Sequence, residues 1–245
     1  MNTKGSTKTI CGLEIYTVKK DIKNIHLGVY PPNGRVRVAV PIKTPDETIR
    51  ALVVSKMPWI KKQRSKFNKQ ERQTRREYVS GESHFFMGNR YLLNVVKSDT
   101  SPRVEIKRKT RIDMYVRPET TPEKRERLMN AFYRSELRKQ IPPLIKKWEK
   151  ITGINVKEFR IKKMKTKWGA CTPTKQRVWI NLELAKKPLR CLEYVIVHEM
   201  THLVEKNHTY EFKTLMGTFM KQWTQYKEEL NSSALGYSKW EFSLN

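Results

Sequence analysis

One stretch limits what this chain can fold into more than any other. Residues Tyr194–His208 read Y-V-I-V-H-E-M-T-H-L-V-E-K-N-H. Residues four positions apart lie one turn apart on the same face of an α-helix, so a helix here places the imidazoles of His198 and His202 side by side. Glu199 then points toward the neighbouring flank. The spacing predicts a helix that carries two nitrogen ligands with a carboxylate beside them.

This spacing is the H-E-x-x-H motif of zinc hydrolases, in which the glutamate is the general base that acts on water. His208 follows six residues after His202, past the polar break Glu205-Lys206-Asn207. A helix that ends near Asn207 would let the chain turn and bring His208 back as a third ligand. Three protein ligands leave one tetrahedral position open, which is typical of a catalytic zinc site, whereas a structural site closes with four ligands rich in Cys.

The same motif also occurs on ordinary helices, where His and Glu are solvated. The apolar run Tyr194–Val197 argues against that alternative, because it indicates a buried helix in which an uncompensated Glu is costly. Three of the five histidines of the chain also fall within eleven residues, whereas His26 and His84 lie in expected strands with no motif around them. Imidazole ligands make Zn²⁺ the first candidate for the ion.

The net charge of the chain restricts its partners. The sequence holds 51 Lys or Arg and 24 Asp or Glu, for a net charge of +27. Such a surface favours polyanions, with nucleic acid first and anionic membrane or acidic protein after it. Residues 190–245 contain six basic and seven acidic residues, so residues 1–189 carry +28. The positive field therefore belongs to the part of the chain that precedes the H-E-x-x-H helix.

The cysteines and the N-terminus indicate where the chain resides. Cys11, Cys171 and Cys191 form no C-x-x-C pair, and an odd number gives no disulfide framework. The N-terminus lacks an apolar signal region, and no run of apolar residues approaches the length of a membrane span. We therefore expect a cytoplasmic protein with no membrane segment.

Residues 1–117 are expected to form a basic, β-rich N-terminal domain. Residues 1–9 are polar and are expected to fray. The turn residues Pro31–Gly34 and Met87–Asn89 indicate two hairpins. Strands are expected at 13–18, 25–30, 35–40, 91–96, 103–107 and 111–116.

This domain is also expected to contain a long basic helix. Thr44 is a candidate N-cap, and Pro58 is expected to interrupt or kink the helix. Residues Lys56–Arg76 contain nine Lys or Arg and one acidic residue, with Trp59 and Phe67 interspersed. Phosphates need cations and bases stack on aromatic rings, so this segment is the strongest candidate for binding DNA or RNA. The alternative is a solvated helix face, which is what most charge runs are.

Residues 118–245 are expected to form the catalytic domain, which gives an α+β fold overall. A helix beginning after Thr121 is expected to break at Pro142-Pro143 and to resume until Gly153. Strands are expected at 156–164 and 177–184, and the second of them could accept a substrate peptide as an added strand. A further helix is expected after His208, running to about residue 230, and residues 231–245 read as a loop.

The chain resembles the YgjP-like metallopeptidases, which are related to the SprT-like zinc proteases. The resemblance spans nearly the whole chain and is most specific over 167–212. It is carried by Lys167–Cys171 (K-W-G-A-C), Ile180-Asn181-Leu182, Val197–His202 (V-H-E-M-T-H), and Asn207-His208 with Phe212 after it. In the N-terminal part it is carried by Val36-Arg37-Val38, Pro41, Trp59-Ile60, Gly81, Gly88 and Tyr91.

The resemblance implies a zincin-like domain in which the H-E-x-x-H helix packs beside a small sheet. It also implies that His198, His202 and His208 hold zinc and that Glu199 is the catalytic base. Two positions depart from the family: Ala170 stands in place of a usual Ser, and Thr209-Tyr210 stands in place of a small residue and Pro.

Two neighbours of the motif have open roles. The resemblance places Cys171 near the rim of the active site, where it is either a buried unreactive thiol or a reactive one, and nothing in the sequence indicates a depressed pKa. Tyr210 could stabilise an oxyanion, but its position is not a Tyr in the family, so we assign it no role.

These features predict a zinc-dependent endopeptidase. Its substrate is a protein or peptide, and that substrate could be associated with nucleic acid, as the SprT-like relatives suggest. The alternative is a nucleic-acid-binding protein in which the zinc site is structural or catalytically silent.

Overall fold

The computed structural model describes residues 5–30, 34–69, 76–108, 110–164 and 167–232. These residues form a mixed α+β fold with three small sheets, six α-helices and two 3₁₀ helices, which confirms the expected α+β class. Contacts divide the chain into two compact units, one N-terminal of Thr74 and one running from Thr74 to Ser233. The boundary expected after residue 117 therefore lies inside the second unit.

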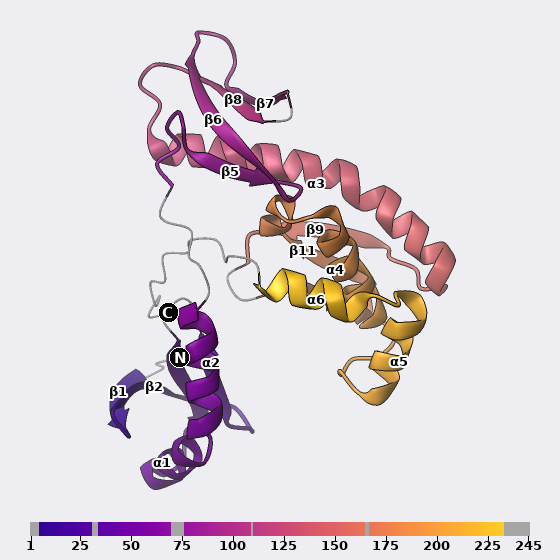
Figure 1. Cartoon of the computed structure of the whole chain (residues 1–245). Helices are drawn as coiled ribbons and strands as arrows, with labels where there is room; N and C mark the ends of the chain where they lie inside the picture. The colour runs from indigo at the N-terminus through magenta and orange to yellow at the C-terminus, as the bar shows by residue number, and fades with distance from the viewer. Residues whose placement is uncertain (1–4, 31–33, 70–75, 109, 165–166, 233–245) are drawn as a thin grey trace. The chain divides into compact units, whose positions relative to one another are not determined.

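The first unit is a four-stranded sheet with two helices (Figure 1). Its strand order is β1-β2-β4-β3, in which β2 and β4 are parallel and the outer pairs are antiparallel. The antiparallel pairing of β3 with β4 confirms the expected hairpin. The elements are β1 (Gly5–Ile10), β2 (Leu13–Lys20), β3 (His26–Tyr30), β4 (Arg35–Pro41), α1 (Asp46–Ser55) and α2 (Met57–Lys69).

Strand β1 is a correction to the sequence analysis, which expected the first nine residues to fray. From Gly5 onward, these residues pair with β2 across a two-residue turn. Cys11 and Gly12 form that turn with φ of 50° and 73°. Two positive φ values in a two-residue loop match the twist of antiparallel strands, so the turn holds a polar strand that hydrophobic patterning does not reveal.

A small core holds the first unit together. The inward side chains of β4, namely Val36, Val38 and Val40, pack with Ile49 of α1 and Ile60 of α2. Pro58 separates the two helices near Lys56, as expected from the missing N–H and fixed φ of proline. Gly34 approaches α2 closely, because a methyl group there would lie 2.7 Å from Cγ of Arg64.

The second unit begins with a sheet that packs on a long helix (Figure 1). Its strand order is β5-β6-β8-β7, and the turn at Met87-Gly88 joins β5 and β6 as expected. Backbone N–H groups of that turn donate to the carbonyls of Ala185 and Lys186, over 2.8 and 3.3 Å. The elements are β5 (Ser83–Phe86), β6 (Asn89–Lys97), β7 (Arg103–Lys107), β8 (Arg111–Val116) and α3 (Pro122–Thr152).

Helix α3 contradicts the expected break at Pro142-Pro143. It is one helix of 31 residues with both prolines inside it. Proline normally disrupts a helix interior because it lacks a donor and its ring meets the preceding turn. Here the buried side chains of Ile141 and Ile145 lie on both sides of the prolines in one core, and that tertiary packing keeps the helix continuous.

A three-stranded sheet follows, made of β9 (Glu158–Lys162), β10 (Gly169–Thr172) and β11 (Arg177–Asn181). The order β10-β11-β9 puts β11 in the middle. The expectation that residues 177–184 offer an edge to substrate is therefore wrong. The outer strands are β9 and β10, of which β10 was not predicted from the sequence. The chain after Asn181 turns into a 3₁₀ helix over Leu182–Lys186.

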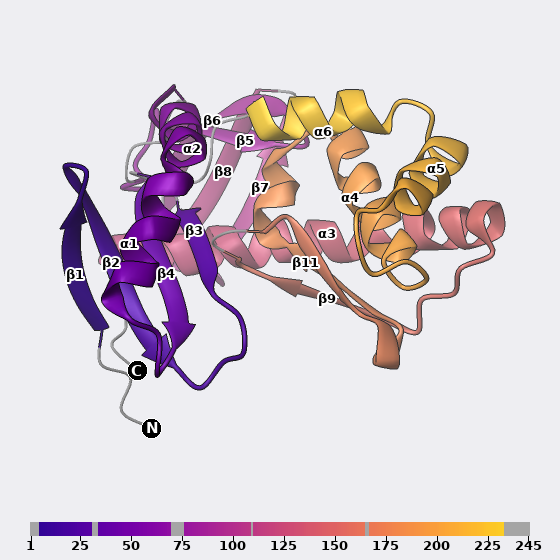
Figure 2. The ribbon, with the colours of Figure 1, turned by 90° about the horizontal axis from the view of Figure 1, so that it is seen from below.

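Helix α4 (Leu189–Thr201) is the centre of the second unit. It packs against α3, β10, β11 and the two C-terminal helices α5 (Tyr210–Phe219) and α6 (Trp223–Ser232). Figure 2 shows α4 beside α5 and α6. From Cys191 onward its apolar side chains are buried, whereas Leu189 at its start is exposed. The single helix expected after His208 is thus two helices. The helices that the structure describes are all too short or too polar to cross a membrane.

Candidate metal centre

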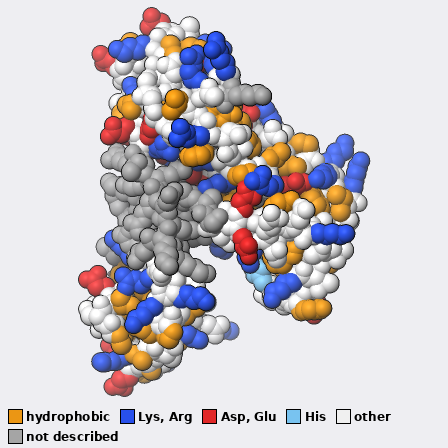
Figure 3. Space-filling model, viewed as in Figure 1, with side chains coloured by type: hydrophobic (Ala, Val, Ile, Leu, Met, Phe, Trp, Pro, Cys, Tyr) orange, Lys and Arg blue, Asp and Glu red, His pale blue; other side chains and the backbone are white. Residues whose placement is uncertain are grey.

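Three imidazoles converge on one point at the end of α4. The Nε2 atoms of His198 and His202 are 3.2 Å apart, and Nε2 of His208 lies 3.1 Å from the first and 3.2 Å from the second. Histidine side chains reach the surface of the second unit beside basic side chains (Figure 3). Among the described residues, this is the one cluster of three or more potential ligands that could hold a metal ion.

A turn after α4 brings the third histidine back. The helix ends at Thr201, and the next turn is closed by hydrogen bonds from Val204 N and Glu205 N to the carbonyl of Thr201, over 3.1 and 2.9 Å. The carbonyl of Glu205 in turn accepts a hydrogen bond of 2.9 Å from Nδ1 of His202. That bond fixes the tautomer of His202 and leaves its Nε2 unprotonated, as a metal ligand requires.

The ring of Phe212 orients all three histidines. Its centroid lies 5.0, 4.5 and 4.8 Å from those of His198, His202 and His208. Thr209, which departs from the family pattern, caps α5 by accepting a hydrogen bond of 3.3 Å from the N–H of Phe212. The hydroxyl of Thr209 therefore supplies a defined helix start where the family usually has Pro.

The arrangement fits a metal ion. Zinc bound at about 2.0–2.1 Å in a tetrahedral site holds its nitrogens roughly 3.3 Å apart, close to the separations found here. Without a cation, the lone pairs of three ring nitrogens at this distance would repel one another. A proton on one nitrogen could form a hydrogen bond to only one of the other two at a time. Nδ1 of His198 is buried with no hydrogen-bond partner in the described part of the chain, so this imidazole has no acceptor that would stabilise its charged form.

Burial favours the neutral form of two of the three imidazoles, those of His198 and His208. Burial lowers the pKa of His198 to about 3, with smaller contributions from the neighbouring His202 and His208. Burial also lowers the pKa of His208, with His202 as the second cause. Neutral imidazole is the form that binds a metal, so the site is ready to bind one at neutral pH.

Glu199 is buried beside the cluster, with 6 % of its surface exposed. Burial raises the pKa of its carboxyl to about 8, and the positive charge of Lys167 opposes that shift. The carboxylate forms no hydrogen bond or ion pair with another residue that the structure describes. Its nearest wall is Gly169 at the start of β10, where a methyl group would lie 2.6 Å from Oε1.

The two residues with open roles lie in different surroundings. Cys171 is half-buried in β10, and burial together with the negative charge of Glu199 raises the pKa of its thiol to about 11. This favours the unreactive interpretation, because the thiolate is the reactive form. Tyr210 is 79 % exposed at the start of α5. The remaining histidines, His26 in β3 and the buried His84 in β5, lie outside the cluster.

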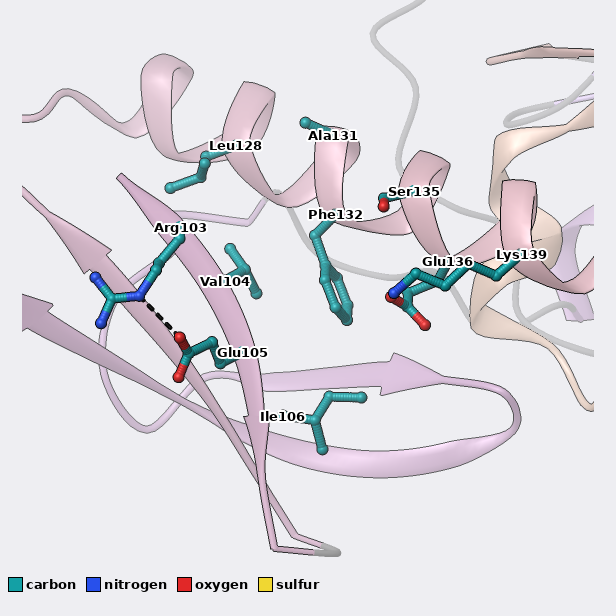
Figure 4. Close-up of a pocket in the computed structure, with 10 residues that line it drawn as sticks. All are labelled: Arg103, Val104, Glu105, Ile106, Leu128, Ala131, Phe132, Ser135, Glu136 and Lys139. Atoms are coloured by element: carbon teal, nitrogen blue, oxygen red, sulfur yellow. Dashed lines mark hydrogen bonds and ion pairs between the residues drawn. The ribbon is translucent and has the colours of Figure 1, made fainter. Parts of the chain in front are cut away.

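A pocket of about 570 Å³ lies elsewhere in the second unit, between β7 and α3 (Figure 4). Its apolar lining includes Val104 and Phe132. Its charged residues pair with one another, Arg103 with Glu105 at 2.8 Å and Lys139 with Glu136 at 2.6 Å. The pocket therefore offers no unpaired charged group for catalysis and is separate from the metal centre.

Comparison with known proteins identifies the family. The family model described as YgjP-like, metallopeptidase domain matches residues 23–233, which confirms the resemblance drawn from the motifs. A search of curated proteins and a search of solved structures each found no match. The match includes the three histidines, Glu199 and the Lys167–Cys171 segment, so the clustered residues all lie within the family domain.

Proposed function

This chain belongs to the YgjP-like metallopeptidase family, and from that premise we propose that it is a zinc-dependent endopeptidase with a zincin-like catalytic domain. The observation that carries the proposal is the convergence of three imidazole Nε2 atoms within 3.2 Å of one another, at the end of the helix that also carries the buried Glu199. A histidine cluster with a buried carboxylate next to it is the constellation that metal-assisted hydrolysis requires.

His198, His202 and His208 would hold the zinc ion. An all-imidazole set suits zinc, and the cluster contains three ligands and no cysteine, so one coordination position stays open as in catalytic sites. When bound, zinc lowers the pKa of a water molecule and polarises the peptide carbonyl.

Glu199 would act as the general base. Its carboxylate would take the proton from the attacking water and pass it to the nitrogen of the leaving amine. Burial raises the pKa of this carboxyl, so it accepts a proton more readily than a solvated glutamate does. The bond from His202 Nδ1 to the Glu205 carbonyl and the packing of Phe212 would keep the ligands in place during this transfer.

The substrate would be an extended peptide that lies along β10. In the part of the chain that the structure describes, β10 pairs only with β11, so its other edge can accept a strand. A substrate that binds through its backbone does not need to present its own N- or C-terminus to the site. This mode of binding therefore suits an endopeptidase.

Replacing Glu199 by Gln tests the proposal. Glu199→Gln keeps the shape of the side chain and the three ligands, so the zinc content should stay near one per chain while cleavage of casein is lost. Glu228→Gln, at an exposed position on α6, is the matched control and should cleave like the wild type. Cleavage by Glu199→Gln at the wild-type rate would show that the proposed mechanism is wrong.

A second candidate function is nucleic-acid binding by the first unit. Trp59 on α2 is 42 % exposed, and the exposed Lys62 lies three residues after it on the same side of the helix. The exposed Lys56 precedes α2, at the end of α1. An exposed ring between cations suits a single-stranded chain, whose phosphates and bases bind to the two kinds of group. Arg64 is less available, because its side chain packs against Gly34. The side chain of Phe67 and residues 70–75 of the basic run lie outside the described residues.

The two functions are compatible, and a protease that cuts proteins associated with nucleic acid would combine them. If instead Glu199→Gln and the wild type both cleave nothing, the alternative of a binding protein with a structural or silent zinc site is supported. The three cysteines are unpaired, which supports a cytoplasmic location as part of this proposal.

A further inference from the structure

The carboxylate of Glu199 is held by the shape of its surroundings. It makes no hydrogen bond to the residues that the structure describes, and the backbone of Gly169 lies close to it. A methyl group at Gly169 would lie 2.6 Å from Oε1 and 2.7 Å from Cγ of Glu199, and 2.8 Å from Cγ1 of Val195. All three distances are shorter than any that a methyl carbon adopts to a carbon or oxygen atom it is not bonded to. Gly169 is not in the left-handed region of φ, so it is required here for space and not for conformation.

The segment that carries Gly169 is tied to the end of β11 by Asn181. This side chain is buried, and its Nδ2 donates to the carbonyls of Met164 and Lys167, over 2.9 and 2.7 Å. Its Oδ1 accepts from the N–H groups of Met164 and Glu183, both over 3.2 Å. Two donors and two acceptor sites are all that a carboxamide has, so Asn181 is fully used.

A backbone bond completes the attachment. The N–H of Asn181 donates to the carbonyl of Trp168 over 2.9 Å, and Gly169 then pairs with Ile180 in the sheet. The residues immediately before Gly169 are therefore fixed by one residue of the neighbouring strand. A displacement at Asn181 would move the wall against which Glu199 rests.

We propose that Gly169 and Asn181 are positioning residues for Glu199: Gly169 leaves the space that the carboxylate occupies, and Asn181 fixes where that space lies. This inference rests on the proposed function, in which Glu199 moves the proton. Neither residue touches the histidine cluster through any described contact, so the effect should fall on proton transfer and not on metal binding.

Gly169→Ala is the direct test. The added methyl group displaces the carboxylate, and a shift of about 1 Å at a reacting group can cost roughly a hundredfold in rate. We expect kcat to fall about a hundredfold, with KM and zinc content close to the wild type. Gly217→Ala on α5 is the matched control, because a methyl group there meets no atom within 4 Å, and it should leave kcat unchanged.

Shortening the side chain of Glu199 shows whether Gly169→Ala acts by displacing the carboxylate or by damaging the fold. Glu199→Asp should lower kcat in the wild type, but it should cost much less when added to Gly169→Ala, because the shorter side chain avoids the methyl group. Additive losses, or a Gly169→Ala enzyme with kcat within twofold of the wild type, would overturn the role of Gly169.

Asn181→Asp tests the second residue and covers the case in which Gly169→Ala fails to fold. It keeps the shape and both acceptor interactions but loses the two N–H donors, so we expect kcat to fall about tenfold with zinc retained. Thermal unfolding of each variant shows whether it is folded. A folded Asn181→Asp enzyme with wild-type kcat would overturn the proposal. An active Glu199→Gln enzyme would instead overturn the proposed function on which it rests.

Discussion

The two units of this protein carry positive charge in different ways. Residues 1–73 contain 16 Lys or Arg and five Asp or Glu, whereas residues 74–233 contain 34 and 18. In the first unit, the described ion pairs of Lys8 and Lys19 share one acid, Asp46. In the second unit, the described ion pairs involve acids on several elements, among them Glu158 of β9, which pairs with Arg177, and Glu183, which pairs with Lys186.

This difference shows why net charge alone does not locate a binding surface. The second unit has the larger number of basic residues, but many of them are already paired and serve its structure. The first unit has about three basic residues for each acid, against about two in the second unit, so a larger share of its positive charge is available to a polyanion. The candidate metal centre thus lies in the second unit and the candidate phosphate-binding surface in the first.

The largest effect expected from this division comes from removing a metal ligand. His202→Ala should lose most of the zinc and lower activity by roughly a thousandfold or more, since the ion supplies the Lewis acid. His26→Ala, at an exposed histidine of the first unit, is the matched control and should change neither quantity. Metal analysis and casein cleavage measure both. Wild-type protein that stays free of metal after exposure to zinc would contradict the metal site itself.

The clustering of the three histidines could be predicted from the sequence because its geometry is mostly local. The spacing of His198 and His202 on a helix sets their separation, and the polar break before His208 allows the chain to return. Turn chemistry was equally informative at Met87-Gly88, where φ of 47° and 83° match a two-residue hairpin turn. In each case a few neighbouring residues determine the conformation.

The features that were missed depend on contacts between distant residues. Strand β10 has four residues and little hydrophobic pattern, and it forms because β11 pairs with it. Helix α3 continues through Pro142-Pro143 because its buried side chains join one core. The motif K-W-G-A-C does not reveal that Gly169 packs closely against Glu199. Local preference does not contain these interactions, so tertiary packing decides them.

A smaller effect is expected from reversing charge on the first unit. Changing Lys56, Lys61 and Lys62 together to Glu should weaken binding of a single-stranded oligonucleotide about a hundredfold at low salt. Each lost phosphate contact removes about 0.7–0.9 from the slope of log K against log salt, so the slope should become shallower by about 2–3. Zinc content and casein cleavage should stay unchanged, because the metal centre belongs to the second unit.

The control for this experiment is a reversal elsewhere in the same unit. Lys23→Glu with Lys43→Glu changes two exposed lysines outside α2 and should leave most of the slope intact. Anisotropy titrations at several salt concentrations distinguish the variants. Equal effects of both reversals would place the interaction on the general charge of the unit, and no binding by the wild type at low salt would remove nucleic acid as a partner.

The smallest effect concerns the acid sensitivity of the second unit, where His84 is 4 % exposed in β5. Burial lowers its pKa to about 4, the positive charge of Arg76 acts in the same direction, and Glu82 opposes both. The Nε2 of His84 lies 3.4 Å from the carboxylate of Glu82, and its ring centroid lies 5.4 Å from that of Tyr78. The folded protein therefore keeps this histidine neutral at a pH where the unfolded chain protonates it.

The sign of the effect follows from this difference. The unfolded pKa is about 6.5, so the contribution of His84 to stability is complete above that pH and is lost as the pH falls toward about 4. Between pH 7 and 5, His84→Gln should make the free energy of unfolding depend less on pH, by on the order of 1–2 kcal/mol. Urea unfolding in the presence of a chelator, followed by tryptophan fluorescence, measures the slope without a contribution from metal release. His26→Gln in the first unit should keep the wild-type slope, and an unchanged slope in His84→Gln would show that this buried histidine does not set the acid sensitivity of the second unit.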